Sequence, residues 1–345
     1  MSSTPSIRVL VYEHVTGGGF AGQDLPESWA AEGHSMRSAL IEDFAAVPGV
    51  HVVSMLDQRF PDPPGPWTTV RVGPGKGENL LSRLSQVAEY TLVVAPETGG
   101  MLTRCYSLVE RGWLGCSRAS IDLCTDKARL ADHLREHGVR VPDHWVVHPG
   151  DPWPSEGPER AVLKPIDGAG SLDTRIVSRS PRLQGFQGPR LLQPFVPGTP
   201  MSASFLVDSH DGRFLLGVGM QRQAVSTAEL GYLGGLIPHG DLSWADEAGR
   251  AVEAVPGLRG WVGVDFIRGE SGVCTVVEIN PRVTTSLVGI RSHLPSGLLA
   301  RAWLACVRGD GELLADSIAP QVHARPCVAF SSDGLIIEPE WGAGE

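Results

Sequence analysis

The sequence predicts an α/β protein whose amino-terminal part holds a parallel sheet and whose remainder is a strand-rich α+β region. Strand-like and helix-like segments alternate over residues 7–95, and such alternation is typical of a parallel sheet. Apolar runs that suit strands then crowd residues 161–280. Two of these runs, at 261–267 and 276–280, are separated by the turn residues 269–272, which predicts an antiparallel hairpin.

The elements of the amino-terminal part follow from apolar spacing. The expected strands lie at 7–12, 50–55 and 91–95, and the expected helices at 36–47 and 79–90. Parallel sheets bind ligands at the carboxyl ends of their strands, so the glycine run 17–19 and the loop 96–100 are candidate substrate loops. The glycine run does not match G-x-G-x-x-G, and a flexible turn is an equally good interpretation of it.

A second unit is predicted to begin near residue 122 with a helix that Thr125 or Asp126 can cap. Lys127 then lies in the first turn, where a cation is unfavourable for the helix dipole. Its presence hints at a bound anion, although a solvated lysine is the commoner explanation for one lysine alone. Closing helices are expected at 286–293 and 296–307, and a strand is expected in the tail at 322–330.

Residues 161–164 form a predicted strand that ends in Lys164 and runs into a glycine-containing turn. Backbone N–H groups of such a turn can approach an anion closely, and Ser171 adds a hydroxyl group. These features suit phosphate binding beside the Lys164 ammonium group. The order differs from G-x-x-x-x-G-K-[ST], which disfavours a P-loop NTPase.

The predicted hairpin is the strongest chemical feature of the chain. Glu278 and Asn280 lie two residues apart on a strand, so both point to one face. If Ser271 and Gly272 form the loop, antiparallel pairing sets Asp265 opposite Glu278. Two carboxylates and an amide suit Mg²⁺, which proteins hold with one or two carboxylates plus substrate phosphates. An exposed acidic pair is the ordinary alternative, but the apolar neighbours indicate half-buried carboxylates that need a partner.

Composition and charge narrow the class of protein. A chain of 345 residues suggests two or three domains. The net charge of -10 disfavours nucleic acids and acidic membranes as partners. No signal peptide is expected, no apolar stretch approaches the about 18 residues of a membrane helix, and the six cysteines lack C-x-x-C spacing. We therefore expect a cytoplasmic protein with small-molecule substrates, and a homodimer is compatible with the sequence.

Five motifs in order resemble those of the ATP-grasp superfamily of carboxylate-amine ligases. They are Asp126-Lys127, Leu163-Lys164-Pro165 with its glycine loop, Gln193-Pro-Phe-Val-Pro-Gly, Asp265, and Glu278-Ile-Asn-Pro-Arg. Each is weak alone, but their order and the thirteen-residue interval from Asp265 to Glu278 make the resemblance specific over about residues 120–310. It implies a Rossmann-like pre-ATP-grasp domain at 1–120, an ATP-grasp lid subdomain at 121–195 and a catalytic subdomain with its tail at 196–345.

The resemblance also implies an ATP site. Lys127 and Lys164 would bind the phosphates of ATP, with Lys164 also acting in catalysis. The mobile lid loop would include Gly168, Gly170 and Ser171. Adenine would lie between Gln193 and Val196; many members of the superfamily have glutamate in place of Gln193, but an amide oxygen can also accept a hydrogen bond from the adenine amino group.

Metal and catalytic roles follow in the same way. The resemblance implies that Asp265, Glu278 and Asn280 hold one or two Mg²⁺ ions, for which Mn²⁺ can substitute. Arg282 would face the transferred phosphoryl group and the acyl intermediate. Four further polar residues are expected near the carboxylate or amine substrate, with helix capping as the alternative and the stronger interpretation of Ser286: Glu97, Thr284, Thr285 and Ser286.

A narrower resemblance covers most of the chain and points to the ligases that join glutamate to tyramine in methanofuran biosynthesis. It rests on residues 11–13, 39–44, 95–97 and 280–286. It implies γ-glutamyl transfer to tyramine or a related amine, through an acyl phosphate, in the synthesis of a one-carbon cofactor. D-alanine ligases have Pro-Gly after the asparagine, which speaks against that branch. The alternatives are another amino acid or dipeptide ligase and a nucleotide-binding regulator without turnover; the intact acidic set argues against the regulator.

Overall fold

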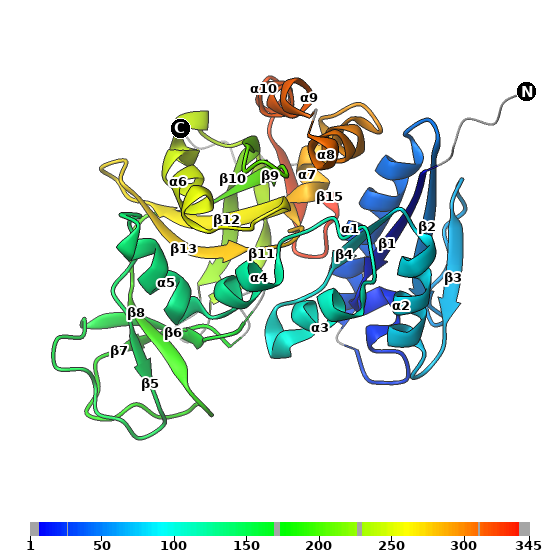
Figure 1. Cartoon of the computed structure of the whole chain (residues 1–345). Coiled ribbons are helices and arrows are strands. Elements are labelled where there is room, and N and C mark those ends of the chain that lie inside the picture. Colours follow the sequence, from blue (N-terminus) through cyan, green and yellow to red (C-terminus); the bar gives the residue numbers. More distant parts are fainter. Residues whose placement is uncertain (1–6, 26, 169–172, 226–229, 310, 338–345) are drawn as a thin grey trace, which may run out of the picture.

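The structure, a computed structural model, describes residues 7–25, 27–168, 173–225, 230–309 and 311–337 (Figure 1). Across these ranges the strands form a parallel sheet, a large sheet of seven strands and a smaller antiparallel sheet. The parallel sheet forms the amino-terminal part of the molecule, and the smaller sheet projects from the opposite side of the large one (Figure 1). No helix within the described ranges is long and apolar enough to cross a membrane.

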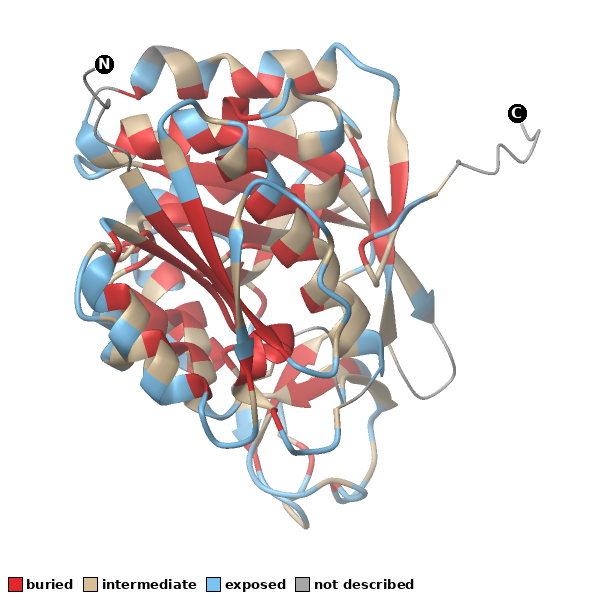
Figure 2. Cartoon of the chain, turned by 90° about the vertical axis from the view of Figure 1, so that its right-hand side faces the viewer, coloured by how far each residue is buried: buried red, intermediate tan, exposed pale blue. Residues whose placement is uncertain are grey.

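The amino-terminal sheet has the strand order β3-β2-β1-β4, and all of its neighbouring strands are parallel, as predicted. Its strands are β1 (Ile7–Glu13), β2 (Val50–Asp57), β3 (Thr68–Val72) and β4 (Tyr90–Val94). The connecting helices are α1 (Glu27–Ala45), α2 (Gly77–Val87) and α3 (Met101–Leu108), and short helical turns lie at η1 (Val15–Gly19) and η2 (Thr98–Gly100). Side chains alternate along β1, so Val9 and Val11 pack with α1 while Leu10 and Tyr12 pack with α2. Figure 2 shows these strands buried between helices with exposed outer faces.

The large sheet has the order β13-β12-β9-β10-β11-β14-β15. Its strands are β9 (Thr199–Val207), β10 (Arg213–Val225), β11 (Leu230–Ile237), β12 (Gly260–Arg268), β13 (Cys274–Asn280), β14 (Val328–Ser331) and β15 (Ile336–Ile337). The associated helices are η3 (Leu242–Ala245), α6 (Asp246–Ala254), α7 (Ser286–Ser292), α8 (Leu298–Arg308), α9 (Glu312–Asp316) and α10 (Ile318–His323). The closing helices are confirmed, but the predicted tail strand at 322–330 is wrong in its first half. There α10 continues to His323, and β14 begins only at Val328.

The smaller sheet has the order β5-β8-β6-β7 and follows two helices that connect it to the amino-terminal part. Its strands are β5 (Trp145–Val147), β6 (Arg160–Pro165), β7 (Arg175–Ser178) and β8 (Arg190–Pro194), and the preceding helices are α4 (Arg118–Thr125) and α5 (Lys127–Glu136). The Asp126 carboxylate accepts hydrogen bonds from the backbone N–H groups of Ala128 and Arg129. Of the two predicted caps, Asp126 is therefore the one that caps α5 and places Lys127 in its first turn.

The hairpin of β12 and β13 contains a bulge beside the acidic pair. Phe266 pairs with Val276, whereas Asp265 pairs with Glu278, so Val277 is an extra residue on β13. Without this bulge, Asp265 would lie opposite Val277. The connecting loop is also longer than the two residues predicted, because Gly269 donates its N–H to the carbonyl of Val273. The bulge compensates for the longer loop, and the predicted pairing of Asp265 with Glu278 is confirmed.

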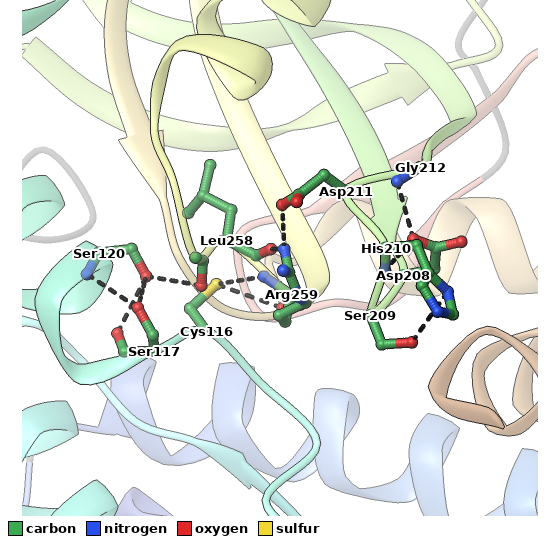
Figure 3. Close-up of polar contacts among 11 residues, drawn as sticks. Cys116, Ser117, Ser120, Asp208, Ser209, His210, Asp211, Gly212, Leu258 and Arg259 are labelled. Carbon is green, nitrogen blue, oxygen red and sulfur yellow. Dashed lines mark hydrogen bonds and ion pairs between the residues drawn. The ribbon is translucent and has the colours of Figure 1, made fainter. Parts of the chain in front are cut away.

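Hydrogen bonds from backbone and side-chain groups tie the segment before α4 to the turn before β12 (Figure 3). The N–H of Ser117 donates to the carbonyl of Gly257 at 2.8 Å, and the Cys116 thiol donates to the carbonyl of Arg259 at 3.2 Å. On the other side of this turn, the Arg259 guanidinium pairs with Asp211 at 2.6 Å. These contacts fix the amino-terminal part against the large sheet, so residues from both can form one site.

A buried carboxylate on α1 also joins the two parts. Asp43 accepts hydrogen bonds from the backbone N–H groups of Gly297, at 2.8 Å, and Ala300, at 2.7 Å, where α8 begins. Replacing Asp43 with alanine leaves both buried donors unpaired, and we expect the free energy of unfolding to fall by about 2 kcal/mol or more. Glu42→Ala is the matched control, because the half-exposed Glu42 only pairs with Arg291 and should contribute at most about 1 kcal/mol. Urea denaturation followed by circular dichroism measures both, and equal losses would contradict this role of Asp43.

Candidate active site

A cavity of about 600 Å³ lies between the smaller sheet and the large sheet. Seven of the residues predicted for ATP and metal binding line it: Lys127, Lys164, Gly168, Gln193, Val196, Asp265 and Glu278. The other two residues of the predicted lid loop, Gly170 and Ser171, lie outside the described residues. The cavity walls also include the apolar side chains of Val162, Met220 and Ile267. A cavity with apolar walls and a cationic end suits a nucleotide, whose base is flat and whose phosphates are charged.

The two lysines form the cationic end of this cavity. Lys127 and Lys164 are both buried, and Lys127 donates to the carbonyl oxygen of Gly168 and pairs with a Glu278 carboxylate oxygen at 3.1 Å. Burial lowers the pKa of Lys164 to about 8; the nearby Glu278 carboxylate opposes this shift, and the Lys127 ammonium adds to it. Burying two neighbouring ammonium groups raises the free energy of the folded protein unless anions neutralise their charge. The pair is therefore well placed to bind phosphate oxygens.

Asp265 and Glu278 line the same cavity beside the lysines, and Asn280 adjoins Asp265 just outside it. The Asn280 amide nitrogen donates to one Asp265 carboxylate oxygen at 3.2 Å, and the Gln221 amide nitrogen donates to the other at 2.7 Å. Burial and, after it, the facing Glu278 carboxylate together raise the pKa of Asp265 to about 7. A bound cation would offset both the burial of Asp265 and its repulsion from Glu278. The side-chain oxygen of Asn280 could also bind this cation, because only the nitrogen contacts Asp265.

The donor set fits a magnesium ion that shares its ligands with a nucleotide. Within the described ranges, no group of three or more His, Cys, Asp or Glu residues could hold a metal ion. Asp265 and Glu278 do match the one or two carboxylates with which proteins hold Mg²⁺ when substrate phosphates complete the coordination. These residues, with Asn280, could hold the ion at the phosphate end of the cavity.

Arg282 lies beyond the metal-binding candidates and pairs with Glu97 of the amino-terminal part. Its guanidinium donates from Nε and pairs through Nη2 with the Glu97 carboxylate, at distances of 2.9 to 3.0 Å, and both side chains are nearly buried. Burial by itself would lower the pKa of Arg282, but the charge and hydrogen bonds of Glu97 outweigh it and raise that pKa. The pair fixes the guanidinium plane beside Asn280. Glu97 therefore orients Arg282.

A smaller cavity adjoins the first and shares Gln221, Asp265 and Glu278 with it. Its other lining residues are Glu32, Ser202, Tyr232, Asn280, Arg282, Thr284, Thr285 and Ser286. Asn280 and Arg282 are thus placed at this second cavity rather than at the first. The two cavities meet at the acidic pair, which is the arrangement that transfer of a group from a nucleotide to a second substrate requires.

The capping role expected for Ser286 is wrong. Ser286 is the first residue of α7, and its hydroxyl group exchanges hydrogen bonds with Ser204, at 2.8 Å, and Thr284, at 2.7 Å. Thr285 similarly contacts the Tyr232 hydroxyl group at 3.0 Å. These side chains satisfy each other at the wall of the second cavity, and their place near a substrate stays a prediction.

The glycine run 17–19 does not line any of these cavities. A Cβ atom on Gly17 would lie 2.8 Å from the Tyr12 ring, and one on Gly18, whose φ is +104°, would lie 2.4 Å from Val72. Glycine is required at these positions because the turn packs closely against the side chains of β1 and β3. Of the two interpretations of this run, the turn is the one that the structure supports, although these contacts make it a closely packed turn and not the flexible one expected.

Comparison with known proteins agrees with this geometry. The family model of the ATP-grasp domain matches residues 124–286, and that of the pre ATP-grasp 3 domain matches residues 50–121. The chain is similar to the tyramine–L-glutamate ligases of Methanocaldococcus fervens and Methanocaldococcus jannaschii, with 26% and 27% identity over 297 residues. These matches span 83% of this chain in both cases, and 90% and 85% of the two ligases.

Solved structures show the same fold. An ATP-grasp superfamily protein from Archaeoglobus fulgidus superposes with a TM-score of 0.65 and 23% identity, over 86% of this chain and 88% of the other. The L-amino acid ligase of Bacillus licheniformis gives 0.60 and 12%, over 95% and 80%. The predicted fold, a parallel-sheet domain before an ATP-grasp region, is confirmed. With a pre-ATP-grasp domain followed by an ATP-grasp domain, this chain belongs to the ATP-grasp superfamily.

Proposed function

We propose that this chain is an ATP-dependent ligase that forms an amide from the γ-carboxyl group of glutamate and the amine of tyramine or a close relative. The observation that supports it best is the meeting of two cavities at Asp265 and Glu278. One cavity has buried lysines that suit a nucleotide, and the other has polar groups that suit a second substrate. The names of both curated relatives support the ligase class and suggest the substrates.

The residues suit the chemistry of carboxylate activation. A carboxylate is a poor electrophile, but transfer of the γ-phosphoryl group of ATP to it gives an acyl phosphate that an amine can attack. Phosphoryl transfer depends mainly on positioning and on neutralising charge. Lys127 and Lys164 would bind the phosphates, and Arg282 would face the transferred phosphoryl group. Mg²⁺, held by Asp265, Glu278 and Asn280, would supply further neutralisation of phosphate charge when bound.

A different amino acid or dipeptide ligase is the second candidate, since the L-amino acid ligase of Bacillus licheniformis has the same fold. A role in methanofuran-type cofactor synthesis, in the cytoplasm, follows only if glutamate and tyramine are the substrates. A regulator that binds nucleotide without turnover does not require the polar second cavity.

An ADP-release assay across pairs of amino acids and amines tests the proposal, with glutamate and tyramine as the first pair. We expect ADP release that needs both substrates and a divalent cation, and mass spectrometry should detect γ-glutamyltyramine. Reactions without the acid, without the amine, or with excess chelator are the controls. Success of another pair alone would discard the named substrates but keep the ligase class. Absence of ADP release with every pair would contradict the ligase and favour the regulator.

A further inference from the structure

A third, small cavity extends the site into the amino-terminal part. It shares Glu32 and Arg282 with the second cavity, so these two residues stand between them. The remaining lining is mostly apolar: Val15, Trp29, Met36, Val94, Ala95 and Pro96. The three cavities therefore form a series, with the nucleotide end first, the acidic pair and Arg282 in the middle, and an apolar end beside α1.

Glu32 differs from the other two carboxylates near this apolar end. Glu13 accepts hydrogen bonds from the backbone of Val15 and from both the backbone and the hydroxyl group of Thr16. Glu97 is fully engaged by Arg282. By contrast, no hydrogen bond or ion pair from the described residues reaches the Glu32 carboxylate. A half-buried carboxylate without a partner, at the junction of two cavities, is available to a ligand.

We propose that Glu32 binds the ammonium group of the acceptor amine and accepts the first proton that this group loses, while the apolar cavity receives the apolar body of the amine. This inference rests on the proposed function and adds the acceptor subsite to it. The predicted ligand class is a primary amine with a compact apolar group, bound next to Arg282. If the acceptor placed a carboxylate group in this cavity, the carboxylates of Glu32, Glu13 and Glu97 would repel it.

The proton transfer completes the balance of the reaction. The amine nitrogen forms a bond to the acyl carbon, the bond from that carbon to the phosphate oxygen breaks, and inorganic phosphate leaves with the electron pair. The ammonium nitrogen loses two protons on the way to the amide: Glu32 takes the first, which frees the lone pair for attack, and the departing phosphate takes the second. Burial raises the pKa of Glu32 to about 7, Arg282 opposes this shift, and Glu13 and Glu97 add to it. A carboxyl group that titrates near neutrality suits this exchange.

Partition of the acyl phosphate between two nucleophiles tests the proposal. Hydroxylamine is small and mostly uncharged at mildly alkaline pH, so it should capture the acyl phosphate as a hydroxamate without help from Glu32. Tyramine is a cation at this pH and should need Glu32 to accept its proton. For Glu32→Gln we expect the ratio of amide to hydroxamate to fall about 10²-fold, with a higher KM for tyramine. Glu27→Gln, an exposed position at the start of the same helix, should keep the wild-type ratio.

The outcomes separate this inference from the proposed function. An unchanged ratio, or equal loss of amide and hydroxamate in Glu32→Gln, would overturn the role of Glu32 while the ligase activity of the wild type stands. A wild type that makes hydroxamate from glutamate but no tyramine amide would overturn tyramine as acceptor, and the ratio is then measured with the amine that it accepts. A wild type that forms neither product overturns both proposals.

Discussion

Replacing Glu278 with glutamine should abolish turnover, with a fall in kcat/KM of at least about 10³-fold. Glu278 lies opposite Asp265 and pairs with Lys127 at 3.1 Å, so it belongs to the proposed metal site and adjoins a lysine proposed to bind phosphate. Asn280→Ala should have a comparable effect, because Asn280 donates a hydrogen bond to Asp265 and would offer its oxygen to the ion that we propose. The fold should stay largely intact in Glu278→Gln, since lost attraction to Lys127 is offset by relief of the repulsion from Asp265.

Two measurements distinguish loss of the metal from loss of structure. Steady-state ADP release gives the kinetic effect, and electron paramagnetic resonance of Mn²⁺ in the presence of ADP gives the affinity for the ion directly. Glu270→Gln is the matched control, because Glu270 is exposed in the loop of the same hairpin. Near wild-type ADP release, or an unchanged Mn²⁺ affinity, in Glu278→Gln would refute the metal assignment.

The strands with continuous apolar runs were predictable, and those without were missed. Residues 7–12 and 91–95 are almost wholly apolar and form buried strands of the parallel sheet. In contrast, β3 lies at the sheet edge with exposed Thr and Arg residues, and no apolar run marks it. β11 contains three glycines in eight residues, which weakens any strand propensity. Its place in the sheet depends on pairing with β10 and β14.

The site residues that lie within short sequence motifs could be predicted. Lys127, Lys164, Asp265 and Glu278 lie in or next to such motifs, and the structure brings them to one cavity. The bulge at Val277 could not be predicted. It depends on the five-residue loop 269–273, which shifts the pairing near the turn by one residue relative to the pairing of Asp265 with Glu278. Gln221, Tyr232 and Glu32 were also missed. They are single polar residues without a motif, and only the packing of strands and α1 around the second cavity brings them together.

The ion pair between Arg282 and Glu97 should have the largest effect on stability. Both side chains are nearly buried, and the pair joins the amino-terminal part to the strand end beside the metal-binding candidates. Glu97→Ala leaves the guanidinium buried without its partner, and we expect the free energy of unfolding to fall by about 3–5 kcal/mol. Urea denaturation measures this loss, with Glu156→Ala, an exposed position in a turn, as the control. A loss below about 1 kcal/mol would contradict the structural role of the pair.

A double variant then separates stability from catalysis. Replacing both partners of a buried ion pair with apolar residues is often neutral, because no charge is left uncompensated. Glu97→Ala combined with Arg282→Met should therefore recover most of the stability that Glu97→Ala loses. It should not recover ADP release, because the guanidinium that would face the phosphoryl group is gone. Recovery of both would show that Arg282 acts only as a structural partner of Glu97, whereas recovery of stability alone would assign it to the chemistry.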